Sequence, residues 1–257
     1  MEGISAIITV LNEEKNIRDL MVSLISQEQP FEVIVVDSMS TDKTPKILKE
    51  YAEKYDFVKY YRKKTTRGGG RNYGASKSNY DYLAFIDGDA IAGEAWIKNL
   101  RALTQNYNLV AGKSINTGNM RYSMERFRLY YGGFEVTRPS SNLMYSKSLF
   151  QSIGGFDENF VTAEDIDMNI RAVKSGAKYA VCDTCIVYTK TRETFRDFKK
   201  QAYWNGYGRW QLREKYGDTI KLSHKMGMQD FLSPVYVARN FYGLRGYVHG
   251  RMKRKKS

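Results

Sequence analysis

The sequence predicts an α/β fold in which a mixed, mostly parallel β-sheet is flanked by helices. In its first half, apolar runs of strand length alternate with segments of helical periodicity. The runs are apolar along their whole length rather than at every second residue, which is typical of parallel strands buried between two helical layers. These strands are expected at residues 4–10, 31–36, 57–61 and 82–86.

Helices are expected between these strands. Asn12 offers an N-cap to the first helix, and Thr44-Pro45 opens the second, because proline suits the first turn of a helix. Gly68-Gly69-Gly70 is expected to form a loop before the fourth strand.

The second half of the chain is less regular. Two strands are expected at residues 109–115 and 142–145, with a helix at 122–131 between them, and further helices at 163–175 and 194–216. Neither an internal repeat nor a low-complexity linker separates these elements. We therefore expect one large domain, of a size that can hold an active site, over residues 1–217, followed by a C-terminal helical appendage over residues 218–257.

The net charge of the chain indicates what kind of partner it binds, and its hydropathy pattern indicates where it resides. The net charge of +13 favours an acidic partner, which is nucleic acid, an anionic membrane surface or a phosphorylated substrate. The N-terminus shows no signal-peptide pattern, and no apolar run reaches the length of a membrane-spanning helix. Cytoplasmic residence is the resulting expectation.

The two cysteines, Cys182 and Cys185, are spaced as Cys-x-x-Cys. A structural zinc site needs four ligands, and only His224 and His249 remain to supply them. The alternating apolar residues around the pair indicate a strand, so two reduced, partly buried thiols are expected.

Polar side chains stand at the carboxyl ends of three predicted strands. They are Asn12, Asp37 and Asp87, and in parallel sheets ligands bind at this edge. Asp87 and Asp89 flank Gly88, whose small size leaves room for a ligand. Two carboxylates so placed can hold a divalent cation against phosphate oxygens.

Five motifs in order resemble the family 2 glycosyltransferases of GT-A (Rossmann-like) fold, over roughly residues 4 to 210. They are Ile8-Thr9-Val10-Leu11-Asn12-Glu13-Glu14, Val35-Val36-Asp37-Ser38-Met39-Ser40-Thr41-Asp42, Asp87-Gly88-Asp89, Gly154-Gly155-Phe156-Asp157-Glu158 and Ala163-Glu164-Asp165-Ile166-Asp167. The resemblance implies transfer of a sugar from a UDP- or GDP-sugar donor, with inversion at the anomeric carbon and the help of Mg²⁺ or Mn²⁺.

The resemblance also assigns the donor side of the site. It makes Asp89 the main metal ligand, with Asp87 near the metal or the ribose, and it places Arg71 near the diphosphate. Asp37 would hydrogen-bond the base, and the nucleotide pocket would be completed by Thr9, Leu11, Glu13 and Gly88. The alternatives are that Arg71 is a surface residue at a helix start and that Asp37 caps a turn.

On the acceptor side, the resemblance makes Asp165 the general base that deprotonates the acceptor hydroxyl. Further acceptor candidates are Glu164, Asn142, Arg209 and Trp210. Two structural alternatives stay open. Acidic residues such as Glu164 and Asp167 are favourable at the start of any helix, and Trp210 can equally be a packing residue.

The chain departs from the family pattern at two places. The family usually has Pro where Thr9 stands. Many relatives have a His, proposed as a metal or diphosphate contact, where this chain has Thr189-Lys190. Either the metal depends on Asp89 alone, or Lys190 supplies positive charge in its place.

The C-terminal appendage carries an apolar stripe at helical spacing, formed by Val237, Phe241, Leu244 and Val248, with arginines beside it and a basic tail behind. An apolar stripe with cationic neighbours suits a helix lying on an anionic bilayer. The alternatives are that the stripe packs on the catalytic domain or on a second subunit. The oligomeric state is not set by the sequence.

Taken together, the motifs predict an inverting glycosyltransferase acting on a hydroxyl of a lipid-linked or cell-surface glycan, at the cytoplasmic membrane face. A polyprenyl-phosphate glycosyl synthase, whose acceptor is the lipid phosphate itself, is the alternative within the family. A basic nucleic-acid-binding module is an alternative of another class, but it leaves the Asp-x-Asp motif and the Glu-Asp pair unexplained. A catalytically dead carbohydrate-binding scaffold is a third alternative, which detectable hydrolysis of a nucleotide sugar would rule out.

Overall fold

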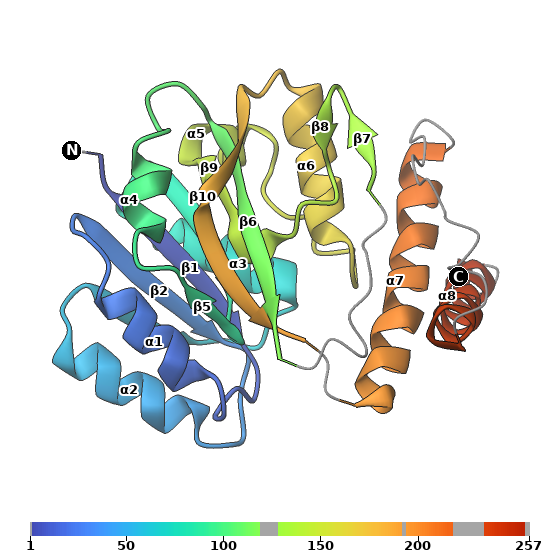
Figure 1. Ribbon diagram of the computed structural model, residues 1–257, viewed down its shortest axis with the longest axis horizontal. Coiled ribbons are helices and arrows are strands. Elements are labelled where there is room, and N and C mark those ends of the chain that lie inside the picture. Colours follow the sequence, from blue (N-terminus) through green and yellow to red (C-terminus); the bar gives the residue numbers. More distant parts are fainter. Residues whose placement is uncertain (1, 119–127, 192–193, 218–233, 255–257) are drawn as a thin grey trace.

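The computed structural model describes residues 2–118, 128–191, 194–217 and 234–254, and Figure 1 shows their arrangement. The core is an eight-stranded sheet with the order β3-β2-β1-β4-β9-β6-β10-β5. Its strands are β1 Ile4–Val10, β2 Phe31–Asp37, β3 Val58–Arg62, β4 Tyr82–Asp87, β5 Ala90–Ala92, β6 Leu109–Thr117, β9 Leu143–Ser146 and β10 Tyr179–Lys190. The helices are α1 Ile17–Ile25, α2 Thr44–Lys54, α3 Arg67–Ser76, α4 Trp96–Arg101, α5 Lys147–Ser152, α6 Glu164–Lys174, α7 Phe195–Tyr216 and α8 Pro234–Arg254, with the 3₁₀ turn η2 Ser140–Asn142.

The first half of the sheet is parallel, as the sequence predicts. β1 lies between β2 and β4 and pairs in parallel with both, and β3 pairs in parallel with β2. The register sets Val10 beside Asp37 and Thr9 beside Asp87. The predicted meeting of the strand ends at one edge is therefore confirmed.

The second half makes the sheet mixed. β9 pairs antiparallel with both β4 and β6, while β10 runs parallel to β6 and antiparallel to β5. The antiparallel β9 carries η2 to the edge where β4 ends. The expected mixed, mostly parallel α/β sheet is confirmed.

Hydrophobic cores fill both faces of the sheet. Alternate residues of β1 face opposite ways: Ile4 and Ile8 belong to one core and Ile7 to the other. The first core joins the sheet to α1, α2 and α4, and the second joins it to α3, α5 and α6 (Figure 1).

Two predicted local features near the site are wrong. Asn12 is no N-cap: it has φ 58° in the link after β1, and α1 begins at Ile17 behind Asn16. The glycines 68–70 form the first turn of α3 rather than a loop. This helix lies so close to β1 that a Cβ on Gly70 would come within 2.7 Å of the Thr9 side chain, so the glycines serve packing.

The helix expected at residues 122–131 lies mostly outside the described residues, and its described end is wrong. Tyr130–Tyr131 form β7, which pairs with β8, Phe134–Glu135, in a separate hairpin. Gly132 and Gly133 connect these strands with positive φ, a conformation that glycine adopts readily.

The expectation of two free thiols is also wrong, because Cys182 and Cys185 form a disulfide. β10 has a register shift between Cys182 and Ile186 that draws the two Cα atoms to 5.3 Å, a spacing typical of disulfides. Strand alternation alone, without this irregularity, keeps such residues apart.

The two C-terminal helices lie side by side at one edge of the molecule (Figure 1). The end of α7 is fixed to α6: Asp167, fully buried, accepts hydrogen bonds from Tyr216 (2.6 Å) and Lys215 (2.7 Å). None of the described helices combines the length and the apolar character that crossing a membrane requires.

Candidate active site

The donor side of the site is built where β1 and β4 end. Gly88 lies against the last residue of β1 and the link after it: a Cβ there would come within 2.8 Å of Val10 and 3.3 Å of Glu13. Thr9 is half-buried beside α3, and Leu11 is 55% exposed. The structure thus brings Thr9, Glu13 and Gly88 together beside Asp87.

Arg71 connects two acidic motifs that are far apart in the sequence. It is 1% exposed, and its Nη2 donates to Asp87 Oδ1 at 2.8 Å while its Nη1 donates to Glu164 Oε1 at 2.8 Å. The alternative of a surface arginine is therefore wrong, and a contact between Arg71 and a diphosphate stays a prediction. With both ends of its guanidinium on protein carboxylates, Arg71 fixes the distance between the donor side and the Glu-Asp pair.

Arg67 is a candidate that the sequence reasoning missed. It stands one helical turn before Arg71, and its side chain is 64% exposed with Nη1 3.8 Å from Glu164 Oε1. Burial lowers the pKa of Arg67, but the charges of Asp87, Glu164, Asp165 and Asp89 act against it, and the pKa is raised overall. The i, i+4 spacing from Arg71 was the available signal, because such residues share a helix face.

Asp37 shapes the loop after β2. It is fully buried: Oδ1 accepts from the Ser40 amide at 2.8 Å and Oδ2 from the Tyr60 hydroxyl at 2.9 Å, with Arg62 at 3.7 Å. Burial and the Asp37 carboxylate together raise the pKa of Tyr60. Ser40 in turn accepts from the Asn12 amide at 2.8 Å. This is the turn-capping alternative, and a contact between Asp37 and a base stays a prediction.

Asp165, the predicted general base, lies in the first turn of α6. Its oxygens accept hydrogen bonds from two backbone amides, that of Ser140 in η2 (3.3 Å) and that of Ile166 in the first turn of α6 (2.9 Å). Its side chain is partly exposed. Burial first, and then the charge of Glu164, raise the pKa of Asp165 to about 6, although Arg71 and the two amides act in the opposite direction. Such a carboxylate is ionised at neutral pH yet more basic than an ordinary aspartate.

The structure orients this pair through an unusual backbone. Ala163, directly before Glu164, has φ 62°, a conformation that a residue with a Cβ rarely adopts. Gly208 of α7 packs against it, because a Cβ at that position would come within 2.9 Å of both Thr162 and Ala163. The long helix α7 therefore supports the turn that presents Asp165.

Two acceptor candidates lie inside the protein. Glu164 is 2% exposed and bound to Arg71. Asn142 is 1% exposed: its Oδ1 accepts from the Trp96 indole, and its Nδ2 donates to the carbonyls of Lys113 and Cys185. These groups already have hydrogen-bond partners within the protein, and an acceptor role for either residue stays a prediction.

Arg209 and Trp210 lie on α7 next to α8. A Cβ on Gly243 would come within 2.6 Å of the Arg209 guanidinium, and one on Gly250 within 2.4 Å of the Trp210 ring. Trp210 also contacts the Tyr207 ring at 5.3 Å between centroids. These positions fit the packing alternative for Trp210, and an acceptor role for either residue stays a prediction.

The carboxylates of Asp87 and Asp89 suit a hard cation that also binds phosphate. Mg²⁺ is commonly held by one or two carboxylates together with substrate phosphates. No group of three or more His, Cys, Asp or Glu side chains in the described part of the chain is arranged to hold a metal. Lys190 is engaged elsewhere, donating to Asn16 Oδ1 at 2.9 Å and lying 3.5 Å from Asp19.

Comparison with known proteins decides the family. Residues 5–170 match the family model described as Glycosyl transferase family 2. The chain belongs to glycosyl transferase family 2. The match includes the strand ends, Arg71, the Asp-x-Asp motif and the Glu-Asp pair, and it ends within α6.

Among relatives of this family 2 chain is a Methanococcus voltae protein, dolichyl N-acetyl-alpha-D-glucosaminyl phosphate 3-beta-D-2,3-diacetamido-2,3-dideoxy-beta-D-glucuronosyltransferase. It is 26% identical over 79% of this chain and 71% of its own length. Three curated relatives align over 79% to 83% of this chain, but the alignments span 55% to 73% of their own lengths.

Solved structures confirm the GT-A fold of the family 2 chain. Staphylococcus aureus TarS 1-349 in complex with UDP-GlcNAc has a TM-score of 0.64 at 18% identity, covering 100% of this chain and 93% of that one. The mannosyltransferase PcManGT from Pyrobaculum calidifontis, in complex with GDP-Man and Mn²⁺, has a TM-score of 0.67 at 14% identity, covering 99% and 75%.

Proposed function

We propose that this chain is an inverting glycosyltransferase that moves a sugar from a nucleotide-diphosphate sugar to a hydroxyl of a lipid-linked or cell-surface glycan. The observation that carries this proposal is the buried bridge of Arg71 between Asp87 and Glu164. This bridge supports the proposal because it joins Asp87, which would help hold the donor metal, to Glu164, whose neighbour Asp165 would deprotonate the acceptor.

On the donor side, Asp89 and Asp87 would hold Mg²⁺ or Mn²⁺ together with the diphosphate of a UDP- or GDP-sugar. The bound cation would stabilise the negative charge that develops on the departing nucleoside diphosphate. Arg67, exposed beside these carboxylates, would add a direct cationic contact to the diphosphate. The complexes of the TarS and PcManGT structures with UDP-GlcNAc, and with GDP-Man and Mn²⁺, support this donor class.

On the acceptor side, Asp165 would accept the proton of the attacking hydroxyl. A base with a pKa of about 6 is deprotonated at neutral pH and is matched to this task. A lipid phosphate acceptor carries no proton that must be removed, so this environment favours a hydroxyl acceptor over the polyprenyl-phosphate alternative. The name of the Methanococcus voltae relative, a transferase onto a dolichyl-phosphate-linked sugar, supports a lipid-linked acceptor.

The donor proposal is tested by thermal shift with UDP-, GDP- and dTDP-sugars, each with and without Mn²⁺. We expect the Tm to rise with one nucleotide class, and more in the presence of Mn²⁺, because a ligand that binds only the folded state stabilises it. If no nucleotide sugar raises the Tm under either condition, the proposed function is wrong.

A further inference from the structure

The face of α8 that meets α7 is made of glycines. Gly243, Gly246 and Gly250 are buried, and a Cβ on Gly246 would come within 1.9 Å of the Tyr203 carbonyl oxygen. On the other side of the contact, a Cβ on Gly206 would come within 1.8 Å of the Gly243 carbonyl oxygen. The backbones approach so closely that any other residue here would separate the helices. This contact fixes which way α8 faces.

The opposite face of α8 is apolar and open to solvent. At 3.6 residues per turn, one line of side chains falls directly opposite the glycines. We call it the α8 stripe; it consists of Val237 (57% exposed), Phe241 (57%), Leu244 (63%), Val248 (44%) and Met252 (57%). A contiguous exposed apolar face of this kind marks a binding surface.

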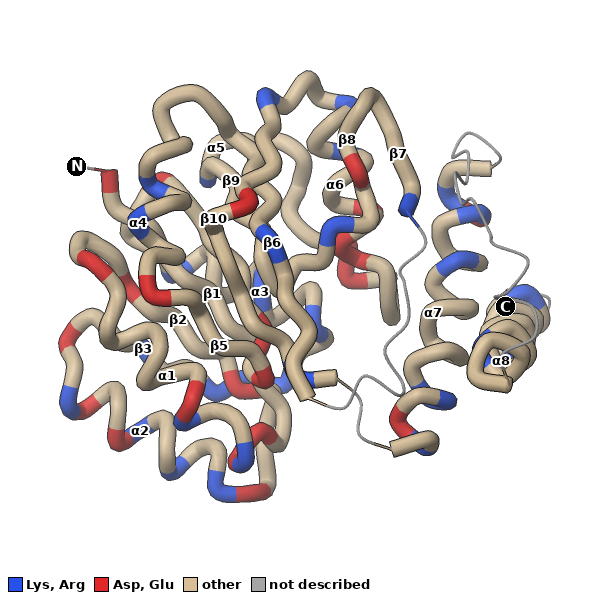
Figure 2. Tube along the Cα trace, in the orientation of Figure 1, with Lys and Arg blue, Asp and Glu red and all other residues tan. Residues whose placement is uncertain are grey.

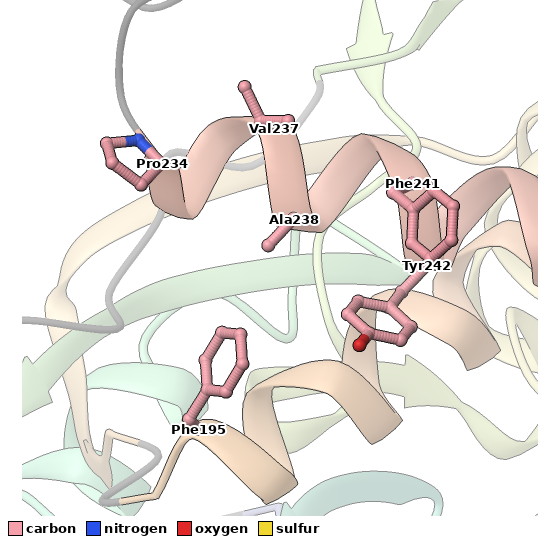
Figure 3. A pocket seen from close by; sticks show the side chains of 6 residues that line it. All are labelled: Phe195, Pro234, Val237, Ala238, Phe241 and Tyr242. Atoms are coloured by element: carbon pink, nitrogen blue, oxygen red, sulfur yellow. The ribbon is translucent and has the colours of Figure 1, made fainter.

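A groove extends the stripe toward α7. Phe195, at the start of α7, is 43% exposed and lies across from the first turns of α8 (Figure 3). The groove between them is lined by Phe195, Pro234, Val237, Ala238, Phe241 and Tyr242. The apolar surface therefore continues from the stripe into this groove.

The charges around the stripe are mostly positive. α8 contains five Lys or Arg residues and no Asp or Glu, and α7 contains six against two (Figure 2). Arg245 and Arg251 are exposed and fall on either side of the stripe. A second copy docked stripe to stripe would set these arginines against each other with no carboxylate on α8 to pair with them. An anionic partner matches the charge.

We propose that the α8 stripe docks on a lipid bilayer that contains anionic lipids, with the apolar side chains at the acyl boundary and Arg245 and Arg251 at the headgroups. A helix with one apolar face and flanking cations binds in this way. This docking would bring the active site to the membrane surface that holds a lipid-linked acceptor. That part of the inference rests on the proposed function. Membrane binding itself requires no nucleotide sugar.

The test is co-sedimentation of the 257-residue chain with large vesicles of phosphatidylcholine, alone or mixed with phosphatidylglycerol, at low and high salt. We expect binding to the anionic vesicles that weakens as salt rises, and little binding to neutral vesicles. Leu244→Glu should lower the affinity by more than about tenfold, because it places a charge at the acyl boundary. Val22→Glu is the matched control, since Val22 is 56% exposed on α1 and the charge change is the same.

A double change, Arg245→Gln with Arg251→Gln, should weaken binding to anionic vesicles by roughly tenfold or more and reduce the salt dependence. Failure of the unmodified chain to bind anionic vesicles at low salt would overturn the proposal, as would equal binding by Leu244→Glu. So would a dimer in light scattering that Leu244→Glu dissociates while vesicle binding is absent. None of these readouts depends on donor binding, so failure here is distinguishable from failure of the proposed function.

Discussion

Arg71 and Glu164 lie 93 residues apart in the sequence, yet Nη1 of one is 2.8 Å from Oε1 of the other, and both side chains are buried. The second guanidinium nitrogen reaches Asp87. A single side chain from α3 therefore couples the end of β4 to the start of α6. Stability and catalysis are expected to depend on it together.

Removing the arginine should destabilise the fold. Arg71→Met removes the 2.8 Å partner of the buried Glu164 and leaves it, among the described residues, only the exposed Arg67, 3.8 Å away, so we expect the free energy of unfolding to fall by about 3–5 kcal/mol. Denaturant titration measures the change. Arg18→Met is the control: it breaks the Arg18–Glu50 pair, in which both side chains are about half exposed, and should cost less than about 1 kcal/mol. Equal losses in the two variants would contradict the structural role of Arg71.

Glu164 should tune the base. Glu164→Gln can keep the hydrogen bond from Arg71 but loses the negative charge, which contributes to raising the pKa of Asp165. The acidic limb of the pH profile of kcat/KM, expected near pH 6 in the parent, should move to lower pH in the variant. An unmoved or rising limb would show that Asp165 is not the titrating base.

Asp165→Asn separates catalysis from stability. Transfer should fall by a factor of about 10²–10⁴, the usual contribution of a general base, while the affinity for donor changes little. The pKa of Asp165 is raised from 3.8 to about 6 in the folded protein, so the folded protein prefers the protonated form. Ionisation of Asp165 therefore lowers the free energy of unfolding as the pH rises from about 4 to about 6, and the full loss is present above that range. The variant should thus have the higher Tm at pH 8 but not at pH 4, as calorimetry at the two pH values would show. A variant that keeps parental turnover would remove Asp165 from the mechanism.

Arg67 should act on the donor. Arg67→Gln removes an exposed cation beside Asp87 and Asp89, and we expect the KM for the nucleotide sugar to rise roughly tenfold, as for the loss of a hydrogen bond to a charged group. Lys46→Gln, an exposed cation on α2, serves as the control with an unchanged KM. If both variants behave as the parent does, the diphosphate is held without Arg67.

Local sequence patterns were enough to predict the parallel strands and the shared edge of the sheet at which Asp37 and Asp87 both lie. Continuous apolar runs identify buried strands, and the parallel arrangement brings their carboxyl ends together. The loop predicted at glycines 68–70 was wrong. Three consecutive glycines usually indicate a flexible loop, whereas here they allow α3 to pack closely against Thr9. That requirement comes from tertiary packing and leaves no local signal.

The same limit applies to the site. The partner of Arg71 was hidden because Glu164 belongs to a different half of the chain, so a resemblance could place the arginine near the donor without showing what it binds. Asn142 lies at a position in the sequence that suits an acceptor contact, but in the structure its side-chain amide hydrogen-bonds Trp96 and two backbone carbonyls. The disulfide likewise depends on an irregularity in β10 that alternation does not reveal.

The central claim is that the Asp-x-Asp motif binds a metal and a nucleotide sugar together. Calorimetric titration of the stabilising nucleotide sugar, with and without Mn²⁺, tests it on the parent, on Asp89→Asn, and on Asp81→Asn as an exposed control just before β4. We expect Mn²⁺ to tighten binding at least about tenfold in the parent and in Asp81→Asn, and we expect Asp89→Asn to abolish this gain. Equal, metal-independent binding by all three proteins would contradict it.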